Sequence, residues 1–169
     1  MLNSFLKDSL IYAVPSLVSR GMSLLLLPLY TRVLSPADYG SFDLLIIFAA
    51  IVNLTIALEV SQGVARFFSS ERNPQKKIGY ASSAFWFTLI CYSIFLAIAL
   101  FYADLLAEIV MGQRGLESSF KIGVLYIWIN GLFYLVQNQL RWELRSVNYA
   151  VISLLMTFVT AGASFYFAY

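Results

Sequence analysis

Residues 28–43 read Pro-Leu-Tyr-Thr-Arg-Val-Leu-Ser-Pro-Ala-Asp-Tyr-Gly-Ser-Phe-Asp and separate two long apolar runs. Ser35 can cap a following helix, because its hydroxyl can accept a hydrogen bond from a free amide of the first turn. Pro36 then occupies the first helical position, where a missing N–H costs nothing, and Asp38 occupies the third, where its carboxylate reaches back to the cap. This pattern predicts that one helix ends near Val33 and that the next begins at about Pro36.

The composition is that of a membrane protein. Of the 169 residues, 60% are hydrophobic and only 12% are charged, and the mean hydropathy is +0.78. Soluble domains carry about 25% charged residues, so a water-soluble fold of this size could not hide this much apolar surface. We therefore interpret the chain as an integral membrane protein.

Several kinds of site are excluded or disfavoured by composition. The sequence has no histidine, which excludes a His-based metal site and a Ser-His catalytic triad within this chain. Its single cysteine, Cys91, can form no intrachain disulfide. No glycine-rich loop precedes Lys-Ser or Lys-Thr, and no Cys/His cluster suggests a metal. A net charge of +2 is too small to indicate a nucleic-acid partner. We predict no cofactor and no enzymatic activity, since no loop carries an evident nucleophile–base pair.

Five apolar runs are long enough to cross a bilayer, whose core takes about 20 residues of helix. The first is not a cleaved signal peptide, because it is too long for one, carries Arg20 at its middle and lacks a small-x-small cleavage site. We predict an all-α, polytopic transmembrane helix bundle that forms a single domain over residues 1–169. Its spans lie at about 9–33, 40–65, 78–102, 119–140 and 147–169, and its loops at 34–39, 66–77, 103–118 and 141–146.

The longest linker, residues 103–118, is predicted to contain a short helix that lies in the membrane interface. Gly112 and Gly115 would end this helix. Its apolar residues recur at helical spacing, and they are Leu105, Leu106, Ile109 and Val110.

The distribution of basic residues predicts the orientation. With a cytoplasmic N-terminus, the loops at 66–77 and 141–146 face the cytoplasm and those at 34–39 and 103–118 face outward. The inside segments then hold seven basic residues and the outside segments hold three, which agrees with the positive-inside rule. The inside residues are Lys7, Arg66, Arg72, Lys76, Lys77, Arg141 and Arg145, and the outside residues are Arg32, Arg114 and Lys121.

Four of the spans carry a polar stripe, because a helix advances about 100° per residue and offsets of 3, 4 and 7 share one face. Lipid cannot satisfy such groups, so these faces are expected to turn toward other helices or a water-filled cavity. The third span has no comparable stripe and is expected to be more peripheral. The stripes are Ser9, Ser16, Arg20 and Ser23; Thr55, Glu59, Gln62 and Arg66; Tyr126, Asn130, Gln137 and Arg141; and Ser146, Ser153, Thr157, Thr160 and Ser164.

Two interpretations compete for the stripes. Helix packing is favoured for the fifth span, which offers only hydroxyls. A polar cavity for a solute is favoured for the first two spans, because an arginine at the centre of a span costs about 2.5–3.5 kcal/mol on insertion. Arg66 either belongs to such a site or extends to the cytoplasmic interface. An Arg20–Glu59 ion pair would require helix tilt, since Glu59 lies nearer the cytoplasmic end of its span.

The string from Pro28 to Gly40, together with Gly63-Val64-Ala65-Arg66-Phe67-Phe68, resembles signatures of the Wzx-type polysaccharide and O-antigen flippases. These belong to the multidrug/oligosaccharidyl-lipid/polysaccharide exporter superfamily, which is MATE-like. The resemblance implies twelve or more spans in two lobes, of which this chain would supply most of the first. The end at Tyr169, without a polar flank, also predicts the amino-terminal part of a longer exporter.

The resemblance further implies a function. The expected activity is movement of an undecaprenyl-diphosphate-linked oligosaccharide across a bacterial inner membrane during polysaccharide or lipopolysaccharide biosynthesis. The expected partners are membrane lipid, this carrier lipid and the polysaccharide polymerase machinery. Glu59 is the candidate ion-coupling carboxylate. The candidate substrate-binding residues are Arg20, Ser16, Ser23, Gln62, Arg66, Asn130 and Gln137.

Two alternatives stay open. A multidrug or cation exporter of the same superfamily would favour carboxylates in its cavity, whereas the central charge here is Arg20. A truncated, non-transporting membrane protein would act only as an assembly partner or as a relic of a broken gene.

Overall fold

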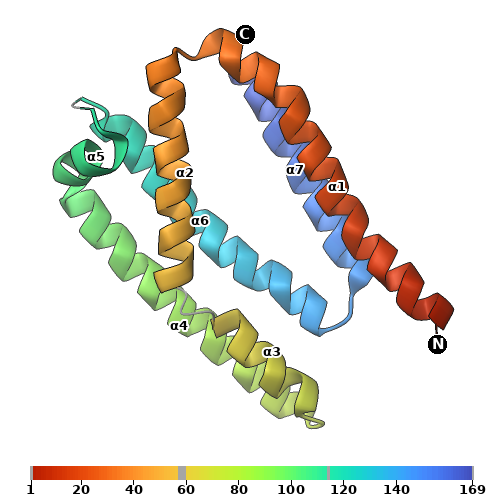
Figure 1. Ribbon diagram of the computed structural model, residues 1–169. Coiled ribbons are helices and arrows are strands. Elements are labelled where there is room, and N and C mark those ends of the chain that lie inside the picture. The colour runs from red at the N-terminus through yellow and green to blue at the C-terminus, as the bar shows by residue number, and fades with distance from the viewer. Residues whose placement is uncertain (1, 57–59, 114, 169) are drawn as a thin grey trace. The chain divides into compact units, whose positions relative to one another are not determined.

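The computed structural model describes residues 2–56, 60–113 and 115–168, and within these ranges it is built from helices alone (Figure 1). In the described residues, five helices are long and apolar enough to cross a membrane. The predicted all-α, multi-span fold class is therefore confirmed. The helices are α1 (Leu2–Val33), α2 (Pro36–Ile56), α3 (Val60–Ser70), α4 (Pro74–Phe101), α5 (Ala103–Met111), α6 (Glu117–Trp142) and α7 (Ser146–Ala168).

The junction between α1 and α2 has the predicted cap. The Asp38 amide donates to Ser35 Oγ at 3.2 Å, and the Ser35 hydroxyl donates to Asp38 Oδ2 at 2.6 Å. Helix α1 ends at Val33 and α2 begins at Pro36, as the sequence predicts. The reciprocal side-chain contact satisfies one of the free amides at the start of α2.

Removal of this cap is expected to loosen the first turn of α2. Ser35→Ala should destabilise that turn by about 1 kcal/mol, because the Asp38 amide loses its acceptor. Hydrogen exchange of the amides at residues 37–39 should then accelerate about fivefold, which corresponds to that energy. Ser35→Thr keeps the hydroxyl and is the control, and unchanged protection in Ser35→Ala would contradict the capping role.

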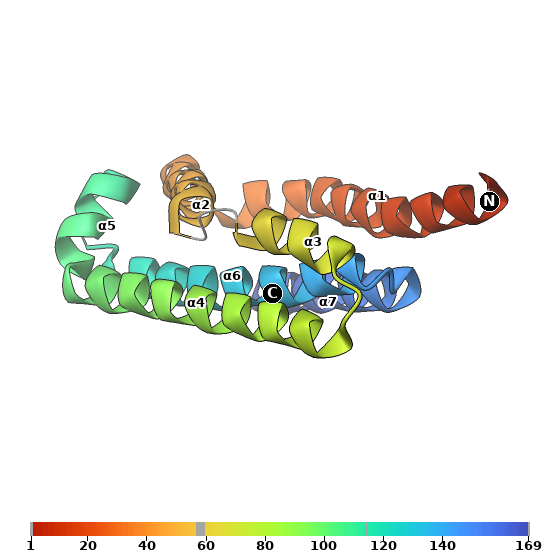
Figure 2. The ribbon, with the colours of Figure 1, turned by 90° about the horizontal axis from the view of Figure 1, so that it is seen from below.

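The helices group into two compact units, Met1–Tyr39 with Glu143–Tyr169 and Gly40–Trp142, rather than into one domain. In the first unit α1 packs along α7 (Figure 2). The rings of Tyr12 and Tyr149 lie 5.3 Å apart, and the Tyr30 and Ser164 hydroxyls lie 2.9 Å apart. Both sequence numbers rise together, so the two helices run parallel, as the first and fifth of five consecutive crossings must.

The second unit is an antiparallel arrangement centred on α4. Helix α4 packs against both α3 and α6, and α5 packs against α6. Phe48 of α2 and Phe67 of α3 contact Phe95 and Tyr80 of α4, with ring centroids 6.2 and 6.1 Å apart. The numbers fall along α4 as they rise along α2 and α3, so α2 and α3 both run antiparallel to α4.

The predicted second span, residues 40–65, differs from the structure. Helix α2 ends at Ile56 and a separate helix, α3, runs from Val60 to Ser70. Hydropathy alone did not show the break, because the apolar run continues through it. The predicted loop at 66–77 is correspondingly shorter, since α3 extends to Ser70 and α4 begins at Pro74.

The turn between α3 and α4 uses the expected Asn-Pro signal. Asn73 caps α4 through a hydrogen bond from the Gln75 amide to Asn73 Oδ1, at 2.9 Å. The Glu71 carboxylate accepts hydrogen bonds from the backbone amides of Asn73 and Arg72. These bonds, that from Asn73 first, lower the pKa of Glu71 below its ordinary value of 4.5.

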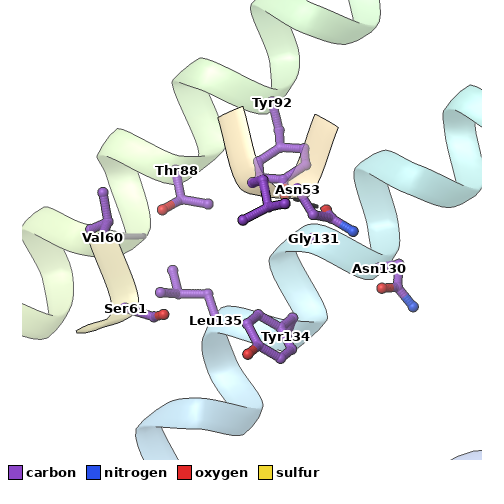
Figure 3. Close-up of a pocket in the computed structure, with 10 residues that line it drawn as sticks. Asn53, Val60, Ser61, Thr88, Tyr92, Asn130, Gly131, Tyr134 and Leu135 are labelled. Carbon is purple, nitrogen blue, oxygen red and sulfur yellow. Dashed lines mark hydrogen bonds between the residues drawn. The ribbon is translucent and has the colours of Figure 1, made fainter. Parts of the chain in front are cut away.

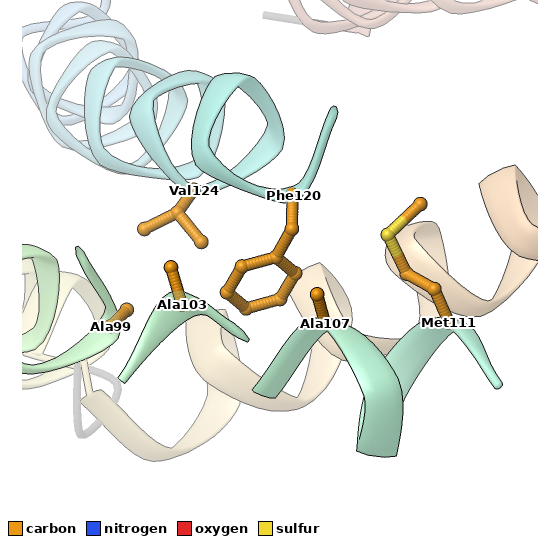
Figure 4. Close-up of a cluster of buried hydrophobic side chains, with 6 residues drawn as sticks. All are labelled: Ala99, Ala103, Ala107, Met111, Phe120 and Val124. Atoms are coloured by element: carbon orange, nitrogen blue, oxygen red, sulfur yellow. The ribbon is translucent and has the colours of Figure 1, made fainter. Parts of the chain in front are cut away.

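A buried apolar cluster joins α4, α5 and α6 at one end of the second unit (Figure 4). Phe120 and Val124 of α6 are fully buried against small side chains of the facing helices. The predicted helix in the linker exists as α5 and ends at Gly112, which has a φ of +68°. Its buried face is nevertheless made by Ala103, Ala107 and Met111, whereas Leu105 and Ile109 are exposed.

Candidate functional site

The second unit contains a cavity of about 160 Å³ at the place where α2 ends and α3 begins, against α4 and α6 (Figure 3). Its polar lining consists of carboxamides and hydroxyls contributed by all four helices. The residues that line it are Asn53, Leu54, Val60, Ser61, Thr88, Tyr92, Asn130, Gly131, Tyr134 and Leu135.

The cavity lies near the middle of the helices that form its walls. Thr88 is halfway along α4, Pro74–Phe101, and Asn130 is halfway along α6, Glu117–Trp142. At about 1.5 Å per residue, each lies about 20 Å from either end of its helix. A helix that crosses a bilayer would thus hold these polar groups at mid-membrane depth, where lipid offers them no hydrogen-bond partner.

The back wall of the cavity is held by one buried tyrosine. Tyr92 is 1% exposed, and its hydroxyl donates to Asn53 Oδ1 at 2.5 Å. The ring fits against α6 only because residue 131 is glycine, since a Cβ there would lie 2.7 Å from Tyr92 Oη and closer still to the ring carbons. Tyr92 therefore fixes Asn53 of α2 relative to α4 and α6.

One polar group in the wall has no partner. Thr88 is 2% exposed, and its hydroxyl makes no hydrogen bond in the described structure. Most hydroxyls in the spans bond to the backbone of their own helix, as Thr55 does to Ile51 O at 2.8 Å and Thr157 to Ser153 O at 2.9 Å. Thr88 does not, so its hydrogen-bonding capacity is left to whatever fills the cavity.

The residues predicted from the sequence for the second unit fall into three groups. Asn130 lines the cavity and donates to the Tyr126 hydroxyl at 3.3 Å. Gln62 and Arg66 lie on the exposed side of α3, next to the face that Ser61 buries. Gln137 is half-buried on α6 and is not among the residues that line the cavity.

The remaining predicted residues are elsewhere. Glu59 lies outside the described residues. Ser16, Arg20 and Ser23 belong to the first unit, on an exposed side of α1. No acidic side chain among the described residues forms an ion pair with Arg20.

The sequence interpretation missed four polar wall residues: Asn53, Ser61, Thr88 and Tyr92. The third span was expected to be peripheral because it has no long stripe, but its helix α4 packs at the centre of the second unit. Thr88 and Tyr92 are four residues apart and share a face, which was the available signal. Asn53 was visible but lay off the stripe of its span, and the break in the helix gave it a role.

The hydroxyls of the fifth span take part in helix packing. Ser153 Oγ donates to Tyr149 O at 2.7 Å, and Ser164 Oγ donates to Thr160 O at 2.9 Å while also contacting Tyr30 of α1. These contacts agree with the packing interpretation that the sequence favoured for this span.

Comparison with known proteins gives one family. Residues 29–169 match a family described as polysaccharide biosynthesis protein. No match was found among curated proteins. No match was found among solved structures. The matched region runs from the end of α1 through the other four membrane-length helices, and the chain belongs to the polysaccharide biosynthesis protein family.

Proposed function

We propose that the chain takes part in moving a lipid-linked oligosaccharide from the cytoplasmic to the outer face of a bacterial inner membrane. The observation that carries this proposal is membership of the polysaccharide biosynthesis family in a chain with five membrane-length helices. Polysaccharide units are made on a lipid carrier and must cross the bilayer, and a transporter needs polar groups inside its membrane span. The cavity in the second unit supplies such groups.

The role proposed for the chain is transport rather than catalysis. An undecaprenyl diphosphate carrier requires cationic partners, which Arg20 and Arg66 provide, since both residues are exposed. The saccharide requires hydroxyls and amides, for which we propose Ser16, Ser23, Gln62, Asn130 and Gln137. Glu59 is proposed as the carboxylate that couples transport to an ion.

The proposed orientation places the N-terminus in the cytoplasm and the turn between α3 and α4 on the same side. The basic residues near that turn support this orientation, because Arg72, Lys76 and Lys77 cluster around a single acidic residue, Glu71. We also propose that the polysaccharide polymerase machinery receives the lipid on the outer face.

Deletion of the gene in its source bacterium tests the proposal. Radiolabelled lipid-linked oligosaccharide should accumulate in the inner membrane, shielded from a lectin added to spheroplasts, and expression of the chain's gene should restore its exposure. Unchanged exposure in the deletion strain would contradict the proposal. Loss of resistance to cationic dyes, with normal exposure of the saccharide, would instead indicate a drug exporter.

A further inference from the structure

The cavity in the second unit is polar but carries no ionised side chain among its described lining residues. Its polar atoms come from two asparagines, two tyrosines, a serine and a threonine. A diphosphate requires charge-assisted hydrogen bonds from cations or an array of amides. We propose that this cavity binds one neutral sugar residue of the transported lipid and not its diphosphate, an inference that rests on the proposed function.

The Thr88 hydroxyl is the strongest reason to expect a polyhydroxyl ligand. A buried hydroxyl without a partner is destabilising by about 1–3 kcal/mol, and Thr88 could avoid this by bonding its own helix, as Thr55 does. A ligand hydroxyl in the cavity can satisfy Thr88 and can accept or donate as needed. The burial of this unpartnered group therefore indicates a ligand with hydrogen-bonding atoms.

The other wall residues suit the same ligand. Ser61 is 9% exposed and lies across the cavity from Asn130, which keeps a carboxamide oxygen available beside its bond to Tyr126 (Figure 3). Tyr134 is half exposed and offers both an apolar ring face and a hydroxyl, as sugar surfaces do. Asn53 and Tyr92 are already bonded to each other and act as the rigid back wall.

The size of the cavity limits the ligand to one residue. A volume of 160 Å³ holds about five water molecules, at about 30 Å³ each. An oligosaccharide could not enter as a whole, so the remaining sugars must lie outside the cavity. The cavity then recognises one position of the saccharide, by the hydrogen bonds that Thr88, Ser61 and Asn130 make to it.

The test compares lipids that differ only in the sugar. The purified chain in lipid nanodiscs is incubated with undecaprenyl diphosphate, or with the same lipid carrying one N-acetylglucosamine or one galactose. Native mass spectrometry then measures the bound fraction. We expect at least one sugar-bearing lipid to bind more tightly than the bare lipid. Thr88→Val should weaken that binding about five- to tenfold, the effect of one hydrogen bond, and should leave the bare lipid unaffected.

Matched variants separate a sugar contact from a folding defect. Thr88→Ser keeps the hydroxyl and should bind as the wild type does. Thr55→Val removes a hydroxyl that is bonded to its own helix and should also bind normally. If Thr88→Val does not fold, Ser61→Ala takes its place, with the same expected selective loss.

The outcomes distinguish the sugar site from the proposed function. Equal binding of bare and sugar-bearing lipid, or equal loss of both in Thr88→Val, would overturn the sugar site while leaving lipid transport in place. Failure of the wild-type chain to bind any of the three lipids above the level of phosphatidylglycerol would overturn both.

Discussion

Replacement of Arg20 with alanine is expected to lower the polysaccharide on the cell surface about 10- to 100-fold. Arg20 lies near the middle of α1, and among the described residues no acidic side chain pairs with it. A hydrogen bond to a charged group contributes about 1.5–3 kcal/mol, which corresponds to this range of affinity. If Arg20 contacts the diphosphate of the carrier, as proposed, the alanine variant loses that contact.

The physical argument separates this loss from a folding defect. An arginine at the centre of a span costs about 2.5–3.5 kcal/mol on insertion, so Arg20→Ala should insert as well as the wild type or better. Quantitative blotting of the membrane fraction checks the yield, while lectin staining of whole cells measures the polysaccharide. Reduced staining at unchanged or higher yield is the expected combination.

Two variants serve as controls for Arg20→Ala. Arg20→Lys keeps the charge but loses the planar fork that binds phosphate through two hydrogen bonds, so it should retain part of the activity. Arg32→Ala removes an arginine from the exposed last turn of the same helix and should stain normally. Wild-type staining in Arg20→Ala would remove this residue from the mechanism.

The number of membrane-length helices and the junction at residues 33–36 could be predicted from the sequence, because both depend on local signals. Long apolar runs define helices by length, and Ser35 with Asp38 defines a cap by spacing. The break after Ile56 could not be predicted in this way. Hydropathy averages over about 20 residues, whereas the break and its consequences depend on which side chains pack against Tyr92 and Gly131.

The candidate site was predictable in kind but not in its members. Polar residues inside spans correctly indicated a polar interior, and Asn130 was among them. Periodicity, however, groups residues along one helix, whereas the cavity collects single residues from four helices. Thr88 is one hydroxyl in a mostly apolar helix, and its significance appears only when its missing partner and its burial are known.

Replacement of Gly131 with alanine is expected to destabilise the second unit by about 1–3 kcal/mol, the usual effect of overpacking a core. A Cβ at this position would overlap the end of the Tyr92 ring. The ring cannot turn aside easily, since it is 1% exposed and its hydroxyl is bonded to Asn53. Its displacement would break that bond and leave both polar groups unpaired. Equilibrium unfolding of the chain in mixed detergent micelles measures the change.

Comparison with two other glycines shows why the effect should be specific. Gly162 lies in α7, where an added Cβ would meet nothing within 4 Å, so Gly162→Ala should stabilise by up to about 1 kcal/mol through helix propensity alone. At Gly123 the nearest atoms belong to Leu45, a flexible side chain that is only partly buried. Leu45 can change rotamer, so Gly123→Ala should be less harmful than Gly131→Ala.

A double-mutant cycle identifies Tyr92 as the cause. In a Tyr92→Ala background the ring is absent, so Gly131→Ala should no longer destabilise the chain and should recover the gain in helix propensity. If the penalty of Gly131→Ala were the same in both backgrounds, the clash with Tyr92 would not be its origin. Because Tyr92 also forms the back wall of the cavity, the alanine at 131 should reduce sugar binding together with stability. Thr88→Val, in contrast, should reduce sugar binding with much less effect on stability, since its hydroxyl has no partner to lose.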